Sequence, residues 1–162
     1  MAKKNDKTEK TNVMRLLEQA GIEYTEHCYA DSDAISGLDV AAYLHEDPDH
    51  VFKTLVTVGY KGEHYVFVVP VSMDLSLKKA AVAVGEKSIE MIKQKDLLPL
   101  TGYIHGGCSP VGMKKLFTTV VDETALLYDT IMVSAGKIGY QVELDPNDLA
   151  KAVPLEFKDI AE

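Results

Sequence analysis

Cysteine is scarce in this sequence, because the 162 residues contain only Cys28 and Cys108. The two lie far apart with no CxxC pair, which excludes a disulfide framework and a cysteine-based zinc site as expectations. The five histidines share no metal-ligand spacing either, so each is expected at the surface or in packing. We therefore expect no metal and no cofactor, and reduced thiols fit a cytoplasmic protein.

Long hydrophobic runs are also missing. No window approaches the roughly eighteen apolar residues of a membrane span, and the lysine-containing start lacks the apolar core of a signal peptide. We expect no membrane partner. The hydrophobic content of 46% and the charged content of 26% are ordinary for a globular protein, and the length suits one domain. We expect that domain over 11–162, after a disordered N-terminus at 1–10.

Arginine is nearly absent, since Arg15 is the only one among 17 basic residues. The net charge of −8 argues by itself against a nucleic-acid partner, and we expect no binding to DNA. The acidity is uneven, however: residues 51–140 carry ten basic against eight acidic residues, whereas 1–50 carry five against eleven. Any phosphate contact made by residues 51–140 would use lysine as a point charge. The simpler alternative is that these lysines are solvated surface residues with no ligand.

Two common catalytic motifs are absent as well. The sequence has neither a GxSxG elbow nor a P-loop, which would need GK[ST] after a GxxxxG frame. Cys108 stands beside Ser-Pro with no assured histidine partner, so a packed thiol is favoured over a nucleophile.

What is present is an alternation of helical and strand patterns. They predict an α+β fold, a single domain with a mixed, barrel-like β-sheet and surrounding helices. Helices are expected at 8–20, 37–44, 73–85 and 145–153, and strands at 22–29, 51–60, 64–71, 88–92, 116–122, 130–136 and 140–144. The strands at 51–60 and 64–71 should form a central antiparallel hairpin.

Two helices have predicted inner faces. In the first, the inward residues are expected to be Val13, Leu16, Leu17 and Ala20. In the third, they are expected to be Leu75, Leu77, Ala81 and Val82, with Asp74 or Ser76 at its start and Gly85 at its end.

Lys53 stands inside the most hydrophobic strand, in VFKTLV. Alternation places it on one face with Val51 and Leu55, so the ammonium needs an edge or a cavity to reach water. A snorkelling surface lysine is the ordinary interpretation. The functional one is a cation at a cavity wall that holds a phosphate or an oxyanion.

The stretch GYIHGGCSPVGMKK, residues 102–115, contains four of the eleven glycines. Backbone amides at Gly106 and Gly107 can approach a ligand closely, although a plain turn explains a lone Gly-Gly pair as well. A second small-residue run, SAGKIG at 134–139, follows a predicted strand. The two loops are expected to border one cleft and to bring to it Ser109, Lys114, Lys115, Ser134 and Lys137.

Three segments in this order, VFKTLV, GGCSPVGMKK and VSAGKIGYQVEL, resemble the YbaK-type aminoacyl-tRNA deacylases. These enzymes are relatives of the editing insertion of bacterial prolyl-tRNA synthetase. The resemblance covers the chain after residue 10 and is strongest to the branch that acts on Cys-tRNA(Pro). It implies a trans-acting enzyme that removes cysteine from mischarged tRNA(Pro), and also from tRNA(Cys), with prolyl-tRNA synthetase as a partner.

The resemblance also assigns roles by position. Lys53 and Gly106 match catalytic positions. The positions that match substrate-binding ones are Tyr29, Ser36, Thr54, Gly107, Ser134 and Gln141. Lys114, Lys115 and Lys137 are expected to contact the tRNA. Ser36 replaces a bulky phenylalanine of some members, and Gln141 replaces an aspartate, which bears on pocket shape and selectivity.

The implied mechanism uses the substrate's own thiol, so it needs no catalytic cysteine, histidine or metal. Backbone donors would orient the activated ester and stabilise the oxyanion. Two alternatives remain open. The chain could remove alanine in place of cysteine, or it could be a non-catalytic module that binds tRNA or a synthetase.

Overall fold

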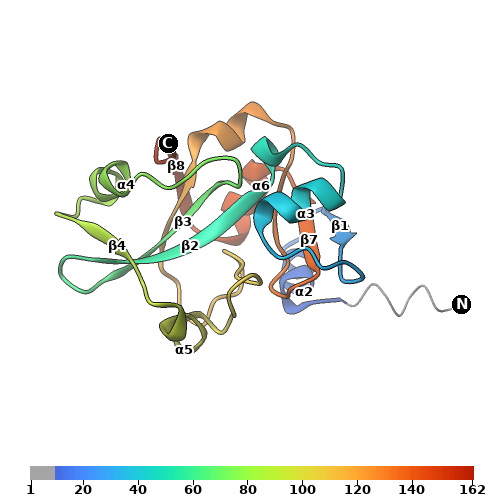
Figure 1. The fold of residues 1–162 in the computed structure, drawn as a ribbon, viewed down its shortest axis with the longest axis horizontal. Coiled ribbons are helices and arrows are strands. Elements are labelled where there is room, and N and C mark those ends of the chain that lie inside the picture. The colour runs from blue at the N-terminus through green and yellow to red at the C-terminus, as the bar shows by residue number, and fades with distance from the viewer. Residues whose placement is uncertain (1–9) are drawn as a thin grey trace, which may run out of the picture.

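The computed structural model describes residues 10–162, so most of the predicted disordered segment, residues 1–9, lies outside the described residues. Figure 1 shows the β2–β3 hairpin as a long central ribbon, with α4 and β4 at one end of the molecule and β1, β7, α2 and α3 at the other. The α-helices are α2 (Asn12–Gln19), α3 (Gly37–Tyr43), α4 (Leu77–Val84), α5 (Leu97–Thr101) and α6 (Pro146–Ala152). Short 3₁₀ helices occupy Pro48–His50, Gln94–Asp96 and Glu123–Leu127.

Eight strands form two separate sheets. The strands are β1 (Thr25–Cys28), β2 (Phe52–Gly59), β3 (His64–Pro70), β4 (Ile89–Met91), β5 (Thr118–Asp122), β6 (Ile131–Ser134), β7 (Tyr140–Leu144) and β8 (Leu155–Lys158). Their orders are β1-β7-β6 and β4-β2-β3-β5-β8, and an isolated bridge between Val51 and Met132 links the two sheets. The α+β class is confirmed. The barrel-like closure is not, because the strands of residues 10–162 divide between two sheets.

Alternation along β3 builds two hydrophobic clusters. Val66 and Val68 face the larger one, which also contains Val13 and Leu17 of α2 and side chains of β6 and β7. Phe67, on the other face, packs with residues of α4. The larger cluster therefore fills the space between the sheets, while the smaller one attaches α4 to the outer face of the five-stranded sheet.

Helix α2 begins at Asn12, later than the predicted start at residue 8, and α4 begins after Ser76, the second of the two predicted caps. Ser36 accepts a hydrogen bond from the Asp39 amide at the start of α3, and Ser76 caps α4 in the same way. Gly85 ends α4 in the left-handed region, as expected for a glycine after a helix. The central hairpin is confirmed as well, with Lys53 opposite Val69.

The predicted inner faces need correction in both helices. Val82 of α4 is 78% exposed and Leu77 is exposed too, because the helix packs through Ala80 and Ala81. In α2, Ala20 is exposed as the C-cap residue, and Met14 is buried in addition to the expected residues. No helix within residues 10–162 has the length and apolar character that crossing a bilayer requires.

One buried carboxylate ties the C-terminal segment to the sheet. Asp122, at the end of β5, is 1% exposed. It accepts hydrogen bonds from the Ile160 and Ala161 amides at 3.0 and 2.9 Å, and from the amide and hydroxyl of Thr124. Both oxygens of the Asp122 carboxylate therefore have hydrogen-bond partners, as a buried carboxylate requires.

Candidate active site

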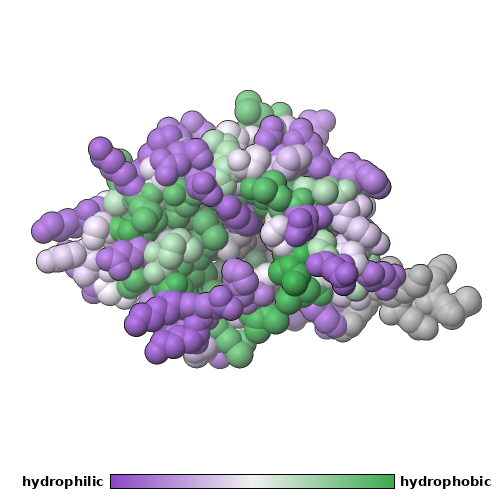
Figure 2. All heavy atoms as spheres, viewed as in Figure 1, coloured by the Kyte–Doolittle hydropathy of each residue, from purple (hydrophilic) through white to green (hydrophobic). Residues whose placement is uncertain are grey.

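A cavity of about 390 Å³ opens among α3, the first half of β2 and the two glycine-containing loops. Figure 2 shows hydrophobic and hydrophilic side chains meeting around a hollow near the centre of the face that is drawn in Figure 1. Seven of the eight residues predicted to be catalytic or substrate-binding line this cavity: Tyr29, Ser36, Lys53, Thr54, Gly106, Ser134 and Gln141. They come from segments spread between residues 29 and 141, so the fold brings together what the sequence separates.

Lys53 is the second residue of β2, near the open end of the hairpin, and it lines the cavity. Its side chain is 33% exposed, and its Nζ lies 3.7 Å from Oδ1 of Asp74, a side chain that is 86% exposed. An ion pair of this length with such an exposed partner is weak and screened by solvent. The ammonium is therefore available to an anionic group that enters the cavity.

Two polar atoms of the cavity wall are buried without a hydrogen-bond partner among the described residues. They are Oγ1 of Thr54 and Oε1 of Gln141, whose residue is only 7% exposed. A buried polar atom without a partner costs about 1–3 kcal/mol, so native proteins rarely keep one without a reason. Both residues line a cavity wide enough for a small ligand, which would supply the missing partner once either side chain rotates toward it.

The two adjacent glycines have different surroundings. Gly106 has a φ of +89°, where side chains are disfavoured, and its amide has no hydrogen-bond partner among the described residues. Gly107 does not line the cavity, and its amide donates to the Ile104 carbonyl at 3.0 Å. A Cβ at Gly107 would lie 3.1 Å from the Ile138 backbone nitrogen, so this glycine permits close packing of the two loops. Of these two glycines, Gly106 has the amide that is free to meet a ligand.

Three further cavity residues are fixed by local hydrogen bonds. Tyr29 follows β1, is 2% exposed, and donates its amide to the Gly139 carbonyl at 2.7 Å. The Ser36 hydroxyl is the cap of α3, and the Ser134 hydroxyl accepts from the Gly136 amide at 3.1 Å. These contacts fix the N-terminus of α3 and the start of the 134–139 loop, which both contribute residues to the cavity wall.

Two cavity residues with ionisable side chains were absent from the predicted site. Cys108 and the exposed His105 both line the cavity, next to Gly106. Burial raises the pKa of the Cys108 thiol to about 12, although a hydrogen bond with Thr101 opposes the shift. The thiol is therefore protonated at neutral pH, and the expectation of a packed cysteine is confirmed. The adjacency of both residues to the Gly-Gly pair is the signal that would have placed them at the cavity.

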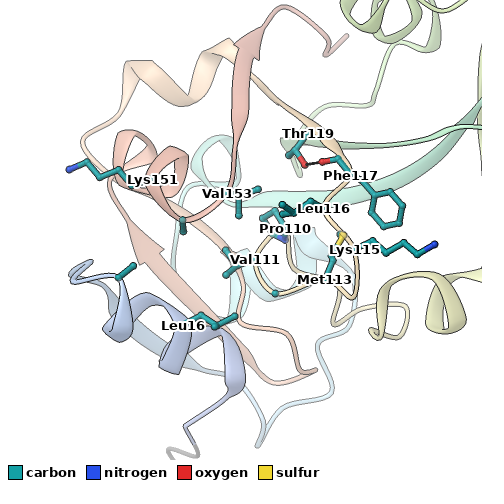
Figure 3. Close-up of a pocket in the computed structure, with 13 residues that line it drawn as sticks. Leu16, Pro110, Val111, Met113, Lys115, Leu116, Phe117, Thr119, Lys151 and Val153 are labelled. Carbon is teal, nitrogen blue, oxygen red and sulfur yellow. Dashed lines mark hydrogen bonds between the residues drawn. The ribbon is translucent and has the colours of Figure 1, made fainter.

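The predicted lysine contacts do not line this cavity. Lys114 donates to the Pro99 carbonyl at 3.3 Å, and the Lys137 ammonium lies 5.7 Å from the ring centre of Tyr140. Lys115 belongs to a separate cavity of about 290 Å³ between α2, the 110–117 segment and α6. Figure 3 shows its walls as mostly apolar, with the Lys115 amine pointing away from them. Ser109 is buried in a turn. Of the five loop residues that were expected to border one cleft, Ser134 alone lines the cavity.

A family model described as the aminoacyl-tRNA editing domain matches residues 33–152. The chain belongs to this family. Within it, the chain is 47% identical over 161 residues to EbsC of Enterococcus faecalis, which is named as a Cys-tRNA(Pro)/Cys-tRNA(Cys) deacylase. That alignment covers 99% of this chain and 98% of EbsC.

A second relative is a proline–tRNA ligase of Pelobacter propionicus. It is 30% identical over 101 residues, which are 62% of this chain but only 17% of the ligase. The editing domain of this family therefore also occurs as one part of a larger protein.

Solved structures share the fold along almost the whole chain. The hypothetical protein APE2540 superposes with a TM-score of 0.84 at 22% identity, over 93% of this chain and 99% of that one. A protein named as a trans-editing enzyme for prolyl-tRNA synthetase superposes with a TM-score of 0.80 at 26% identity, over 93% and 94% of the two chains. The editing-domain fold thus extends beyond the segment that the family model matches.

Proposed function

We propose that this chain is a trans-acting editing enzyme that deacylates Cys-tRNA(Pro) and, like its relative by name, Cys-tRNA(Cys). The observation that carries the proposal is the cavity, where Lys53, the free Gly106 amide and two unpartnered acceptor oxygens meet. A cavity with these groups suits a small aminoacyl ester that carries both a cationic amine and a developing oxyanion.

The ester is cleaved by the substrate's own thiol in this proposal. The thiol loses its proton, its sulfur attacks the ester carbonyl carbon, and the bond from that carbon to the ribose oxygen breaks. The proton ends on the departing ribose hydroxyl, and water then opens the cyclic thioester to give cysteine. The Cys108 thiol, with its raised pKa, supports a route in which the nucleophile comes from the substrate.

Gly106 and Lys53 supply the electrostatic part. A backbone amide that donates to the carbonyl oxygen as it becomes negative contributes about 3–4 kcal/mol in known oxyanion holes. The Gly106 amide has no partner to give up in doing so. Lys53 lies in the same cavity and neutralises negative charge near the scissile bond or on the terminal phosphate.

Thr54 and Gln141 recognise the amino acid. Their unpartnered oxygens accept hydrogen bonds from the substrate's α-ammonium, which offers several donors. A neutral amide at Gln141 attracts this cation less strongly than a carboxylate would. Selection among amino-acid substrates therefore depends more on the shape of the cavity and on its hydrogen bonds.

We also infer that the enzyme works in the cytoplasm with prolyl-tRNA synthetase. The net charge of −8 disfavours tight binding of tRNA by the isolated chain, so a synthetase that presents the charged tRNA would compensate. Lys114, Lys115 and Lys137, outside the cavity, remain the proposed tRNA contacts. Tight tRNA binding by the isolated protein without a steep salt dependence would contradict this partnership.

The test is release of labelled cysteine from Cys-tRNA(Pro), measured in parallel with labelled alanine from Ala-tRNA(Pro). We expect fast loss of cysteine, slow loss of alanine, and a loss of roughly 100-fold or more for Lys53→Ala. Faster release of alanine would make the chain an alanine editor. If neither ester turned over above its spontaneous rate, the chain would be a binding module and not an enzyme.

A further inference from the structure

Three side chains that can ligate a metal meet outside the cavity. They are His27 of β1, Glu143 of β7 and Glu46, which follows α3. One ligand atom of each lies within 4.8 Å of the other two, and His27 Nε2 is 2.8 Å from Glu143 Oε1. Pairing of β1 with β7 sets Thr25 opposite Glu143 and His27 opposite Gln141, so His27 and Glu143 stand on one face of the three-stranded sheet.

Each carboxylate of this group is held by a second residue. The Thr130 hydroxyl donates to Glu143 Oε2, and His50 Nε2 lies 3.1 Å from Glu46 Oε1. The side chains of His27 and Glu143 are only 20% and 23% exposed, as are those of His50 and Glu46. Outer partners of this kind orient metal ligands in known sites, so the ligand atoms are restrained before any ion arrives.

The chemistry of the group suits a cation. Within residues 10–162 both carboxylates pair with histidines, Glu143 with His27 and Glu46 with His50. Burial would raise the pKa of Glu143, but hydrogen bonds from Thr130 and His27 outweigh it and lower the pKa. An imidazole nitrogen and two carboxylate oxygens are ligand types that zinc takes in proteins.

We propose that His27, Glu46 and Glu143 form a binding site for a divalent transition-metal ion of the zinc type. Zinc binds imidazole nitrogen and carboxylate oxygen at about 2.0–2.2 Å, which places the ligand atoms of a tetrahedral site roughly 3.4 Å apart. That spacing lies between the observed 2.8 and 4.8 Å, so small side-chain rotations complete the site. Three protein ligands leave the fourth position to water.

The ion would act on the cavity through the strands. His27 stands two residues before Tyr29, and Glu143 two residues after Gln141, on the strand face that carries these cavity residues. Binding would join β1, β7 and the segment after α3, and so fix one wall of the cavity. This role is structural, and it holds whether or not the proposed deacylase activity does.

The experiment is a titration of metal-free protein with ZnCl₂ by isothermal calorimetry, followed by absorption spectroscopy of the Co²⁺ form. We expect one Zn²⁺ per chain and visible Co²⁺ bands without a thiolate charge-transfer band. His27→Gln and Glu143→Gln should each weaken binding by more than tenfold, and Thr130→Val, which removes an outer partner, by about tenfold. Thermal unfolding without metal shows whether each variant is folded.

The matched control is His45→Asn, which removes an exposed imidazole next to Glu46. Asparagine suits the positive φ of 58° at this position, so the fold should be kept. We expect zinc affinity to be unchanged. No saturable binding to the wild-type protein, equal affinity in folded His27→Gln and Glu143→Gln variants, or a thiolate band that places the metal on a cysteine would each overturn the proposal.

Discussion

Two buried polar regions of the molecule differ in how their hydrogen bonds are satisfied. At Asp122, four donors surround one buried carboxylate and join β5 to the C-terminal segment. In the cavity, the oxygens of Thr54 and Gln141 are buried without any partner among the described residues. The oxygen atoms are buried in both regions, so burial alone does not explain the difference.

The difference separates groups that stabilise the fold from groups that await a ligand. A satisfied buried carboxylate contributes to stability, whereas an unpartnered hydroxyl or amide lowers it until something binds. The cavity therefore carries a cost in folding free energy that the Asp122 region does not. Substitutions in the two regions should move stability in opposite directions.

The largest effect is expected at Asp122. Asp122→Ala removes the acceptor of two buried backbone amides and of Thr124, which should lower the free energy of unfolding by about 3 kcal/mol or more. Urea unfolding measures it. Asp129→Ala, an exposed aspartate on the same segment, is the control and should change stability by less than about 0.5 kcal/mol. Equal losses would mean that the hydrogen bonds at Asp122 contribute nothing special.

The next effect distinguishes the active glycine from an ordinary turn glycine. Gly106→Ala and Gly62→Ala, at φ of +89° and +95°, should each lower stability by about 1–2 kcal/mol through backbone strain. Gly62 lies in the β2–β3 turn with open space around it, so its variant is matched for strain. Only Gly106→Ala should slow release of cysteine from Cys-tRNA(Pro), by at least about tenfold. Equal activity of the two variants would remove Gly106 from the mechanism.

A smaller effect is expected from two threonines of one strand. The Thr57 hydroxyl donates to the Tyr65 carbonyl at 3.0 Å, whereas the Thr54 hydroxyl has no partner among the described residues. Thr57→Val should therefore lower stability by about 1 kcal/mol, while Thr54→Val should leave it unchanged or raise it. Thermal and urea unfolding of the two variants measure the sign, and a comparable loss at Thr54 would show that its hydroxyl is satisfied in the native state.

The smallest effect is expected at Asp74. Asp74→Asn removes the weak ion pair to Lys53, and we expect a change in stability below about 0.5 kcal/mol with deacylation kept within about twofold. Rates and unfolding curves of the variant measure both. A large loss of activity would show that Lys53 depends on this carboxylate for its position.

The sequence predicted most of the fold because its strongest signals are local. Alternation found the central hairpin, and Ser76 and Gly85 marked the ends of one helix through caps that need only neighbouring residues. Local signals failed where packing decides. Helix α5 was missed because it contains Pro99, which its first turn tolerates since amides there have no helical partner. Strand β8 was missed because its four residues alternate weakly and pair with β5 only in the fold.

The candidate site was predicted in part for the same reason. Motif spacing identified Lys53, Gly106 and Ser134, but it could not show that Gly107 packs against the 134–139 loop or that Lys115 lies in another cavity. The contact of His27 with Glu143 joins residues 116 positions apart. No spacing rule detects such a pair, because only the pairing of β1 with β7 creates it.

The pairing of β1 with β7 also has a consequence for synthesis on the ribosome. Strand β1 has no partner until residues 140–144 have left the exit tunnel, and a chain made at about 5–20 residues per second takes on the order of ten seconds to get there. Over the same interval, Tyr29 and Lys53 are already synthesised, but Ser134 and Gln141, which complete the cavity, are not. We therefore expect nascent chains to lack a complete cavity until Gln141 has left the exit tunnel.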